Sequence, residues 1–165
     1  MLTQGNKVIR GSEKKEAFHR AAESRIRAFS FKRPQIELNA QKGVYYLAHS
    51  DILKAVVQII PEGGDNELHY HPGTDGFWMV LKGKARFYGP GGAIGEFGPQ
   101  EGILMPRNSR YWFETASPNT ELHLLQVAVK TQDKVQNSSI HIGQRKSHRK
   151  KVLLLNFPEG VGLRG

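Results

Sequence analysis

Short runs of apolar or alternating residues, separated by stretches rich in Gly, Pro, Asn and Asp, fill the chain from Gly43 to about Lys130. The runs are GVYYLAH, ILKAVVQII, ELHYH, GFWMVLKG, KARFYG, GILMP, YWFET and ELHLLQVAV. Each has the length and composition of a strand, and their even spacing is typical of an all-β sandwich or small barrel. No helical pattern alternates with them, so we predict one antiparallel β domain over residues 40–130.

The two ends of the chain have a different pattern. In residues 1–39, the segment Ser12–Phe29 predicts a helix, with Ser12 as its N-cap and an apolar face at three- and four-residue spacing. That face comprises Phe18, Ala21, Ala22, Ile26 and Phe29. Residues 131–165 form an extension that contains a basic cluster, RKSHRKK, and then the apolar run VLLLNFP. We expect this run to be a strand that docks on the barrel or on a partner chain.

Composition narrows the kinds of site that the chain can hold. Its 165 residues fit one domain with arms, and the absence of cysteine excludes disulfides, thiolate metal sites and a cysteine nucleophile. The polar N-terminus lacks a signal-peptide pattern, and no run approaches the roughly 20 apolar residues of a membrane helix. We therefore expect a soluble, cytoplasmic protein with no membrane partner.

The net charge of +9 lies at the two ends of the chain. Residues 1–39 carry +5, residues 40–130 carry −1, and residues 131–165 carry +5. A neutral body argues against a nucleic-acid site within the domain, although the basic ends leave a weaker electrostatic role open. For RKSHRKK the alternative to such a role is a solvated terminus, since no aromatic residues interrupt it to stack on bases.

His69 and His71 are the first candidate chemical groups. Residues two apart in a strand point to one face, roughly 6.6 Å apart along the chain, so two imidazoles can converge on one ion. The alternative is a pair of neutral imidazoles that are hydrogen-bonded inside the barrel.

The stretch GGDNELHYHPGTDGFWMVLKG resembles the first motif of the cupin superfamily, with Gly63, His69, His71 and Gly83 at the motif positions. PRNSRYWFET, from Pro106, resembles the second motif loosely. The resemblance covers residues 43–130. It implies a small β-barrel of two antiparallel sheets (a double-stranded β-helix, or jelly roll), often dimeric, with a metal and ligand pocket inside.

The sequence departs from the family at important positions. Gly76 stands where the first motif has Glu. In the second motif, Tyr111 replaces His, Asn108 replaces Gly and Thr115 replaces Asn. Two of the four customary metal ligands are therefore replaced.

Asp75 is a candidate third ligand, because the family motif also tolerates a carboxylate at that spacing. Strand alternation turns it outward, but the flanking glycines permit a bulge that re-aims it. Its alternative role is that of a turn residue in PGTDG. Two His, one carboxylate and open positions suit Fe(II), Mn(II) or Zn(II). Tyr111 is the candidate proton-transfer or orienting group.

The alternation of side chains along each strand, which we call strand parity, predicts which residues line the pocket, independently of any metal. If position 76 points inward, Trp78 does too, and if Tyr111 points inward, so does Phe113. On the last long strand, we favour Gln126 over His123 as the inward polar residue. We therefore predict Trp78, Phe113 and Gln126 as substrate-binding residues, although aromatic residues in strands are more often core.

Three hypotheses follow for the function. The first is a metal-assisted enzyme that acts on a small polar or carboxylated substrate, with an undetermined reaction class. The second is a non-catalytic cupin that serves as a ligand-binding or structural module without metal. The third is a nucleic-acid binder that uses the basic arms. A homodimer is expected if the terminal apolar segments pack on a second chain.

Overall fold

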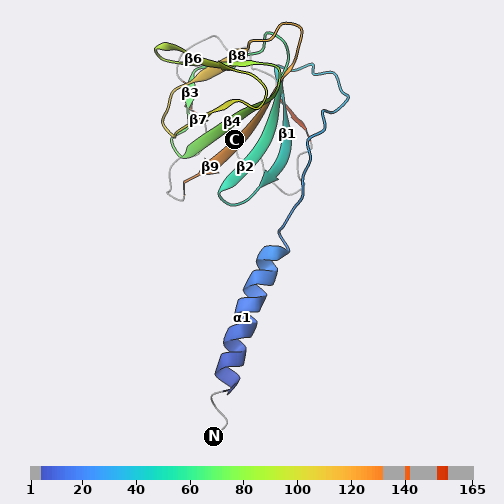
Figure 1. Ribbon diagram of the computed structural model, residues 1–165, viewed down its shortest axis with the longest axis vertical. Coiled ribbons are helices and arrows are strands. Elements are labelled where there is room, and N and C mark those ends of the chain that lie inside the picture. The colour runs from blue at the N-terminus through green and yellow to red at the C-terminus, as the bar shows by residue number, and fades with distance from the viewer. Residues whose placement is uncertain (1–4, 132–139, 142–151, 156–165) are drawn as a thin grey trace. The chain divides into compact units, whose positions relative to one another are not determined.

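The protein is described by a computed structural model that covers residues 5–131, 140–141 and 152–155 (Figure 1). The chain divides into two compact units, Met1–Ser30 and Phe31–Gly165. The first contains the helix α1, and the second contains all the described strands. Among the described residues, no helix is both long enough and apolar enough to cross a membrane.

Helix α1 spans Gly5–Glu23, so the predicted bounds were wrong at both ends. Ser12 lies inside the helix rather than at its N-cap, because the chain is already helical from Gly5. At the C-terminal end the Ser24 hydroxyl donates to the Ala21 carbonyl at 2.9 Å. Bonding of this kind satisfies one of the last carbonyls of the helix, which lack partners within it.

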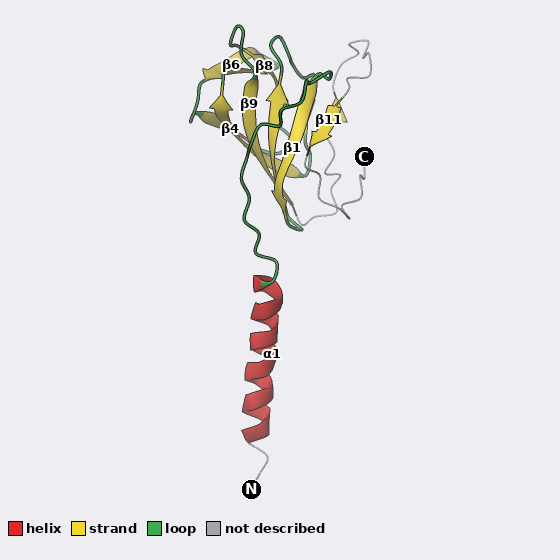
Figure 2. Ribbon diagram, turned by 90° about the vertical axis from the view of Figure 1, so that its right-hand side faces the viewer, coloured by secondary structure: helices red, strands yellow, loops and turns green. Residues whose placement is uncertain are grey.

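A six-stranded sheet forms one wall of the barrel. Its strand order is β11-β1-β2-β9-β4-β7. The strands are β11 (Val152–Leu155), β1 (Lys42–His49), β2 (Leu53–Ile60), β9 (Leu122–Lys130), β4 (Thr74–Lys82) and β7 (Gly102–Met105). All neighbours are antiparallel except β1 and β11, which pair in parallel. Figure 2 shows β11 beside β1 at the edge of this sheet.

The opposite wall consists of shorter strands. β6 (Gly92–Phe97), β5 (Ala85–Gly89) and β8 (Trp112–Thr115) form a three-stranded sheet, and β3 (His69–Tyr70) pairs with β10 (Ile140–His141). Isolated bridges Asp65–Glu114 and His69–Tyr111 join the two groups along β8. His69 therefore lies on a strand that is fastened to the segment carrying Tyr111, and His71 directly follows that strand.

The predicted all-β class is confirmed, and each of the eight predicted runs contains a strand. β6 was missed because its sequence, GAIGEF, lies in a glycine-rich stretch that was taken as a connection. VLLL pairs with β1 of its own barrel, which is one of the two partners expected for it. The basic cluster at residues 145–151 lies outside the described residues.

The core between the two walls is aromatic. The side chains of Trp78, Phe87 and Phe113 are at most 2% exposed, and their rings lie 5.2–6.1 Å apart. Alternation along β4 explains the position of Trp78, since Phe77 on the opposite face is 47% exposed. This close packing leaves little free space inside the barrel.

A second apolar cluster covers the outer face of the large sheet at β1, β2 and β11. Val57, Ile59 and Leu155 are buried there beneath Phe31 and Leu38, which belong to the segment preceding β1. β2 is therefore apolar on both faces and buried along most of its length. Residues 31–41 thus belong to the barrel unit and act as a strap across this face.

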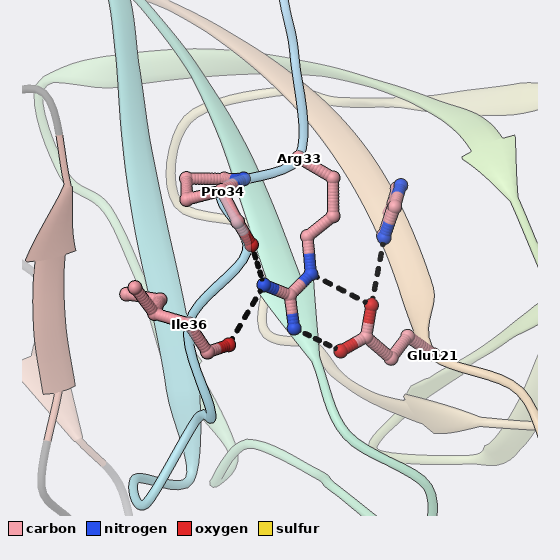
Figure 3. Close-up of polar contacts among 5 residues, drawn as sticks. Arg33, Pro34, Ile36 and Glu121 are labelled. Carbon is pink, nitrogen blue, oxygen red and sulfur yellow. Dashed lines mark hydrogen bonds and ion pairs between the residues drawn. The ribbon is translucent and has the colours of Figure 1, made fainter.

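An ion pair fastens this strap to the start of β9 (Figure 3). Arg33 donates two hydrogen bonds to Glu121, with nitrogen–oxygen distances of 2.6 and 3.0 Å. The same guanidinium donates to the carbonyls of Pro34 and Ile36. His123 Nε2 lies 3.1 Å from the Glu121 carboxylate. The hydrogen bonds from Arg33, more than any other influence, lower the pKa of Glu121 to about 2.

Candidate functional site

His69 and Tyr111 are held together by their backbones. The amide of each residue donates to the carbonyl of the other, at 3.1 and 3.0 Å. Their ring centroids lie 4.6 Å apart, and the His71 ring lies 5.1 Å from that of His69. The Asn108 amide donates to the His71 carbonyl at 2.9 Å, which fixes the other end of this short segment. The fold thus brings His69, His71 and Tyr111 into one cluster.

Asn108 preserves a backbone conformation although its residue type departs from the family motif. Its φ is +68°, within the left-handed region that glycine adopts freely and that asparagine tolerates better than most residues. The replacement of the motif glycine therefore leaves the turn before Tyr111 intact.

The hydrogen bonding of His69 determines which ring nitrogen carries its proton. Nδ1 lies 2.7 Å from the Glu67 carbonyl oxygen, which can only accept a hydrogen bond. In neutral His69 the proton is therefore on Nδ1, and Nε2 keeps its lone pair. Histidines that bind a metal through one ring nitrogen usually donate a hydrogen bond from the other in the same way.

Gly76 provides space that the neighbouring indole enters. A Cβ atom at position 76 would lie 3.1 Å from Trp78 Nε1 and 3.8 Å from the Met105 carbonyl oxygen. Trp78 is only 2% exposed, and its Nε1 has no hydrogen-bond partner among the residues that the structure describes. The indole N–H of Trp78 thus lies against the backbone at Gly76, the position where the family motif has Glu.

Tyr111 is buried, and its phenol stays protonated well above neutral pH. Burial raises the pKa of Tyr111 above its ordinary value of 10, and the nearby indole of Trp78 opposes this rise in pKa only partly. The indole therefore approaches the phenol, but it does not reach hydrogen-bonding geometry, since Nε1 has no partner. A neutral phenol favours the orienting role predicted for Tyr111 over that of a base.

A small pocket opens beside this cluster. Its free volume is about 10 Å³, roughly the space that one water molecule needs. The pocket is lined by His71, Thr74, Gly76, Met105, Pro106, Ser109, Tyr111 and Gln126. Side chains from both walls therefore meet here, and five of the eight lining residues carry a polar side-chain group.

Gln126 points inward, as we favoured from strand parity. It is 8% exposed and lines the pocket, and its Oε1 accepts a hydrogen bond from Gln58 at 3.0 Å. His123 lies on the opposite face of β9, where its ring packs 5.4 Å from that of Phe31. His123 is therefore separated from the histidine pair by the sheet itself.

Asp75 is not brought to the histidines. Its carboxylate accepts a hydrogen bond from the backbone amide of Arg107 at 2.7 Å, and the Arg107 guanidinium binds it at 3.2 Å. These hydrogen bonds lower the pKa of Asp75, and the bond from the Arg107 backbone amide has the largest effect. β4 alternates regularly through this point, so the bulge that would have re-aimed Asp75 does not form. The structure gives no support to Asp75 as a third ligand.

Trp78 and Phe113 both point inward, as parity predicted, but they differ in their relation to the pocket. Phe113 is packed among other aromatic rings and does not line the free space. Trp78 approaches the pocket through the edge of its indole at Gly76. The predicted roles of both residues in substrate binding stay predictions.

The donor set fits a resident divalent metal poorly. Within residues 5–131, 140–141 and 152–155, no group of three or more His, Asp or Glu side chains could hold an ion. Two neutral imidazoles supply no negative charge, and the indole N–H beside Gly76 is a hydrogen-bond donor that cannot bind a cation. We therefore derive no chemical step through a metal.

Sequence reasoning did not identify Thr74 and Ser109, which also line the pocket. Thr74 precedes Gly76 by two residues, so the parity argument used for Trp78 would have found it. Ser109 lies in the PRNS turn, where no periodicity applies. Only the tertiary fold places that turn beside β4.

Comparison with known proteins identifies the fold. The Cupin domain family matches residues 56–128. A conserved protein with a double-stranded β-helix domain from Klebsiella pneumoniae aligns with a TM-score of 0.58 and 17% identity, covering 72% of this chain and 93% of that one. A cupin superfamily protein from Desulfitobacterium hafniense gives 0.52 and 18%, covering 65% and 99%. KdgF from a Halomonas species gives 0.52 and 17%, covering 64% and 96%.

Identities below 20% establish a shared fold and leave the activity open. No protein of curated function matches the sequence. The family match, the two facing sheets and the inward histidine segment agree with one another. Residues 56–128 therefore match the Cupin domain family, and the barrel shares the fold of these solved cupin structures.

Proposed function

We propose that the barrel is a non-catalytic module that binds a small polar ligand beside His71 without a resident metal. The observation that carries this proposal is the polar lining of the pocket, which combines His71, Thr74, Ser109, Tyr111 and Gln126; none of the described residues that line it carries a carboxylate. Small-molecule sites characteristically combine an apolar wall with a few convergent polar groups.

The lining residues suit the recognition of a polar ligand. The protonated phenol of Tyr111 can donate a hydrogen bond, and the hydroxyls of Thr74 and Ser109 can donate or accept. The aromatic rings packed around Tyr111 hold its phenol in place, so this donor loses little conformational entropy when a ligand binds. The free volume of about 10 Å³ limits the part of a ligand that enters the pocket to roughly one heavy atom, so the rest of the ligand would lie at its mouth.

A binding experiment on chelator-treated protein tests this proposal. Small carboxylates, amides and alcohols are titrated while the ring signals of His71 are followed by NMR. We expect at least one of them to bind saturably and to shift these signals, whereas Gly91→Ala, at an open turn, should bind equally well. Failure of every compound to bind would contradict the proposal.

The metal-assisted enzyme predicted from the sequence is the second candidate. One observation favours it: the Glu67 carbonyl holds His69 in the tautomer that leaves Nε2 able to bind an ion. Here His69 and His71 would hold Fe, Mn or Zn, which would act as a Lewis acid or an oxygen-activating centre. Tyr111 would orient a small polar or carboxylated substrate.

Elemental analysis separates the two candidates. One equivalent of metal per chain that is lost in both His69→Ala and His71→Ala would favour the enzyme. Substoichiometric metal that survives both substitutions would favour the binding module. Gly76→Glu is a matched gain-of-function variant, because it restores the customary carboxylate. We expect this variant to retain more Zn(II) than the parent protein.

Three further expectations stay predictions. These are the homodimer, the cytoplasmic location and the minor role of nucleic acid. Size-exclusion chromatography with light scattering checks the first, and salt-dependent DNA retention with and without residues 143–165 checks the last.

A further inference from the structure

We propose that Lys54 and Lys130 bind an anionic group of the ligand, a carboxylate or a phosphate, at the mouth of the pocket beside His71. This inference rests on the proposed function and deepens it, since it names the charge of the ligand and the residues that recognise it. The pocket has a free volume of about 10 Å³, so most contacts with the ligand must lie outside it, at its mouth.

The two lysines lie close together on the inner face of the large sheet. Side chains alternate along a strand, so Lys54 shares the inner face of β2 with Gln58, and Lys130 shares that of β9 with Gln126. Lys54 is paired with Ala128, two residues before Lys130. Diagonal neighbours of this kind have Cα atoms roughly 7–8 Å apart, a distance that allows two lysine side chains to reach one anion.

The register between β9 and β4 places Lys130 beside the pocket. Lys130 is directly opposite Thr74, and Ala128 is opposite Gly76. Thr74 and Gly76 both line the pocket. Directly opposed residues share a face and have Cβ atoms about 4.5–5.5 Å apart. A ligand whose tip lies beside Thr74 therefore has Lys130 as its neighbour and Lys54 on the next strand, since β4, β9 and β2 lie side by side (Figure 1).

The positive charge of these lysines is not neutralised within the part of the chain that the structure describes. Neither Lys54 nor Lys130 forms an ion pair there. The titratable groups that share the inner face around Lys54 are Lys130 on β9 and Tyr46 and His49 on β1. None of these groups is negatively charged at neutral pH.

The acidic residues close to this region in sequence do not supply the missing charge. Asp75, which follows Thr74, binds Arg107 through its carboxylate. Asp51 lies in the exposed turn between β1 and β2, and it forms no ion pair with any residue that the structure describes. An anion that approaches the mouth of the pocket therefore meets two cations.

The position of Lys54 is unfavourable for a cation in the absence of such an anion. Burial lowers the pKa of Lys54, and the charge of Lys130 lowers it further. Both influences disfavour the charged ammonium group, because it loses hydration and lies near a like charge. An anion bound between the two lysines opposes both influences. Lysines that are perturbed in this way and lack a structural partner are typical of binding sites.

The chemistry of lysine determines the choice of probes. Its ammonium group is a point charge with three rotatable donors, which suits both carboxylate and phosphate oxygens. A hydroxyl on the same ligand can enter the pocket, where Thr74 and Tyr111 offer hydrogen bonds. Glycolate carries a carboxylate and a hydroxyl, and inorganic phosphate represents the other anion. Glycolamide is the neutral isostere of glycolate.

An NMR titration of the chelator-treated protein at pH 7 tests the proposal. Each probe is added at constant ionic strength, while the ring signals of His71 and the amide signals of Lys54 and Lys130 are followed. We expect glycolate, phosphate or both to bind saturably, at least roughly tenfold more tightly than glycolamide, and to shift both amide signals. The anion that binds more tightly identifies the class of the natural ligand.

Three variants test the role of the lysines. Lys54→Met and Lys130→Met each remove one charge and keep most of the side-chain length. Lys82→Met is the matched control, because Lys82 is an exposed lysine at the opposite end of β4 from Thr74. We expect each of the first two variants to bind the anion about tenfold more weakly and glycolamide equally well. Lys82→Met should bind both probes as the parent protein does.

The stability of Lys54→Met separates a binding role from a structural one. An apolar side chain that replaces a partly buried, unpaired cation costs no stability, so the urea midpoint of this variant should be no lower than that of the parent. A lower midpoint together with unchanged anion affinity would show that Lys54 is structural, and would overturn the inference.

The remaining outcomes distinguish this inference from the proposed function. Glycolamide that binds beside His71 as tightly as the anions would overturn the inference and leave the proposed function standing. Equal weakening of anion binding in Lys82→Met would overturn it as well, because net charge alone would then explain the effect. Failure of every compound to bind would overturn both proposals.

Discussion

The ion pair between Arg33 and Glu121 makes a prediction about stability that depends on pH. Replacing Glu121 with glutamine keeps the size of the side chain and removes its charge. The strap of residues 31–41 then loses its charged anchor on β9, while the apolar contacts of Phe31 and Leu38 remain. We expect Glu121→Gln to fold and to be less stable than the parent protein at neutral pH.

The magnitude follows from the pKa of Glu121. A fall from 4.5 to about 2 corresponds to at most roughly 3 kcal/mol of stabilisation by the charged form. The two side chains are 27% and 28% exposed, so solvent screens part of this interaction. We therefore expect this bidentate, partly buried ion pair to contribute about 1–2 kcal/mol to the unfolding free energy at pH 7.

The sign of the pH dependence follows from the direction of the pKa shift. The folded-state pKa is lowered, so the stabilisation is complete above the unfolded-state value of about 4.5. It is lost as the pH falls through about 2, when the carboxyl group becomes protonated in the folded state as well. The difference in unfolding free energy between parent and Glu121→Gln should therefore shrink steadily below pH 4.5.

Urea unfolding followed by circular dichroism measures this difference at several pH values. Glu37→Gln is the matched control, because Glu37 is an exposed glutamate on the same strap. Arg33→Met, alone and combined with Glu121→Gln, closes a double-mutant cycle that should give about 1 kcal/mol of coupling. A parent–variant difference that is the same at pH 3 as at pH 7, or an equal loss in Glu37→Gln, would refute the reasoning.

Three further predictions concern the barrel. Gly83→Ala should lower the free energy of unfolding in urea by more than about 1 kcal/mol. The φ angle of Gly83 is +79°, and a Cβ there would lie 2.8 Å from the Glu121 carbonyl oxygen. An equal loss of unfolding free energy in Gly91→Ala would contradict this reasoning. Phe113→Ala should lose about 3–5 kcal/mol of unfolding free energy as a core cavity opens, and Phe77→Ala, at an exposed site, much less. The ionisation of Tyr111 is identified in an ultraviolet titration as the step that the parent protein shows and Tyr111→Phe lacks. We expect this step well above pH 10, and a step at or below pH 10 would show that burial does not raise the pKa of Tyr111.

The positions of most strands along the chain could be predicted from the sequence because they depend on local patterns. Alternation of side chains along β4 and β9 placed Trp78 and Gln126 on the inner face, and burial confirms both positions. The position of β6 could not be predicted in this way, since glycines stand where apolar residues would alternate. Its place in the small sheet depends on pairing with β5, a contact between segments that local sequence does not specify.

The sequence by itself determined that His69 and His71 share a face, and that a glycine stands where the family keeps a carboxylate. Only the tertiary structure decided what surrounds them. Arg107 lies 32 residues from Asp75 along the chain, yet the pairing of β4 with β7 places it where it binds that carboxylate. The indole of Trp78 enters the space beside Gly76 because the aromatic core packs its ring there. Periodicity fixes the side of a strand from which a residue projects, whereas its partner depends on packing between segments distant in sequence.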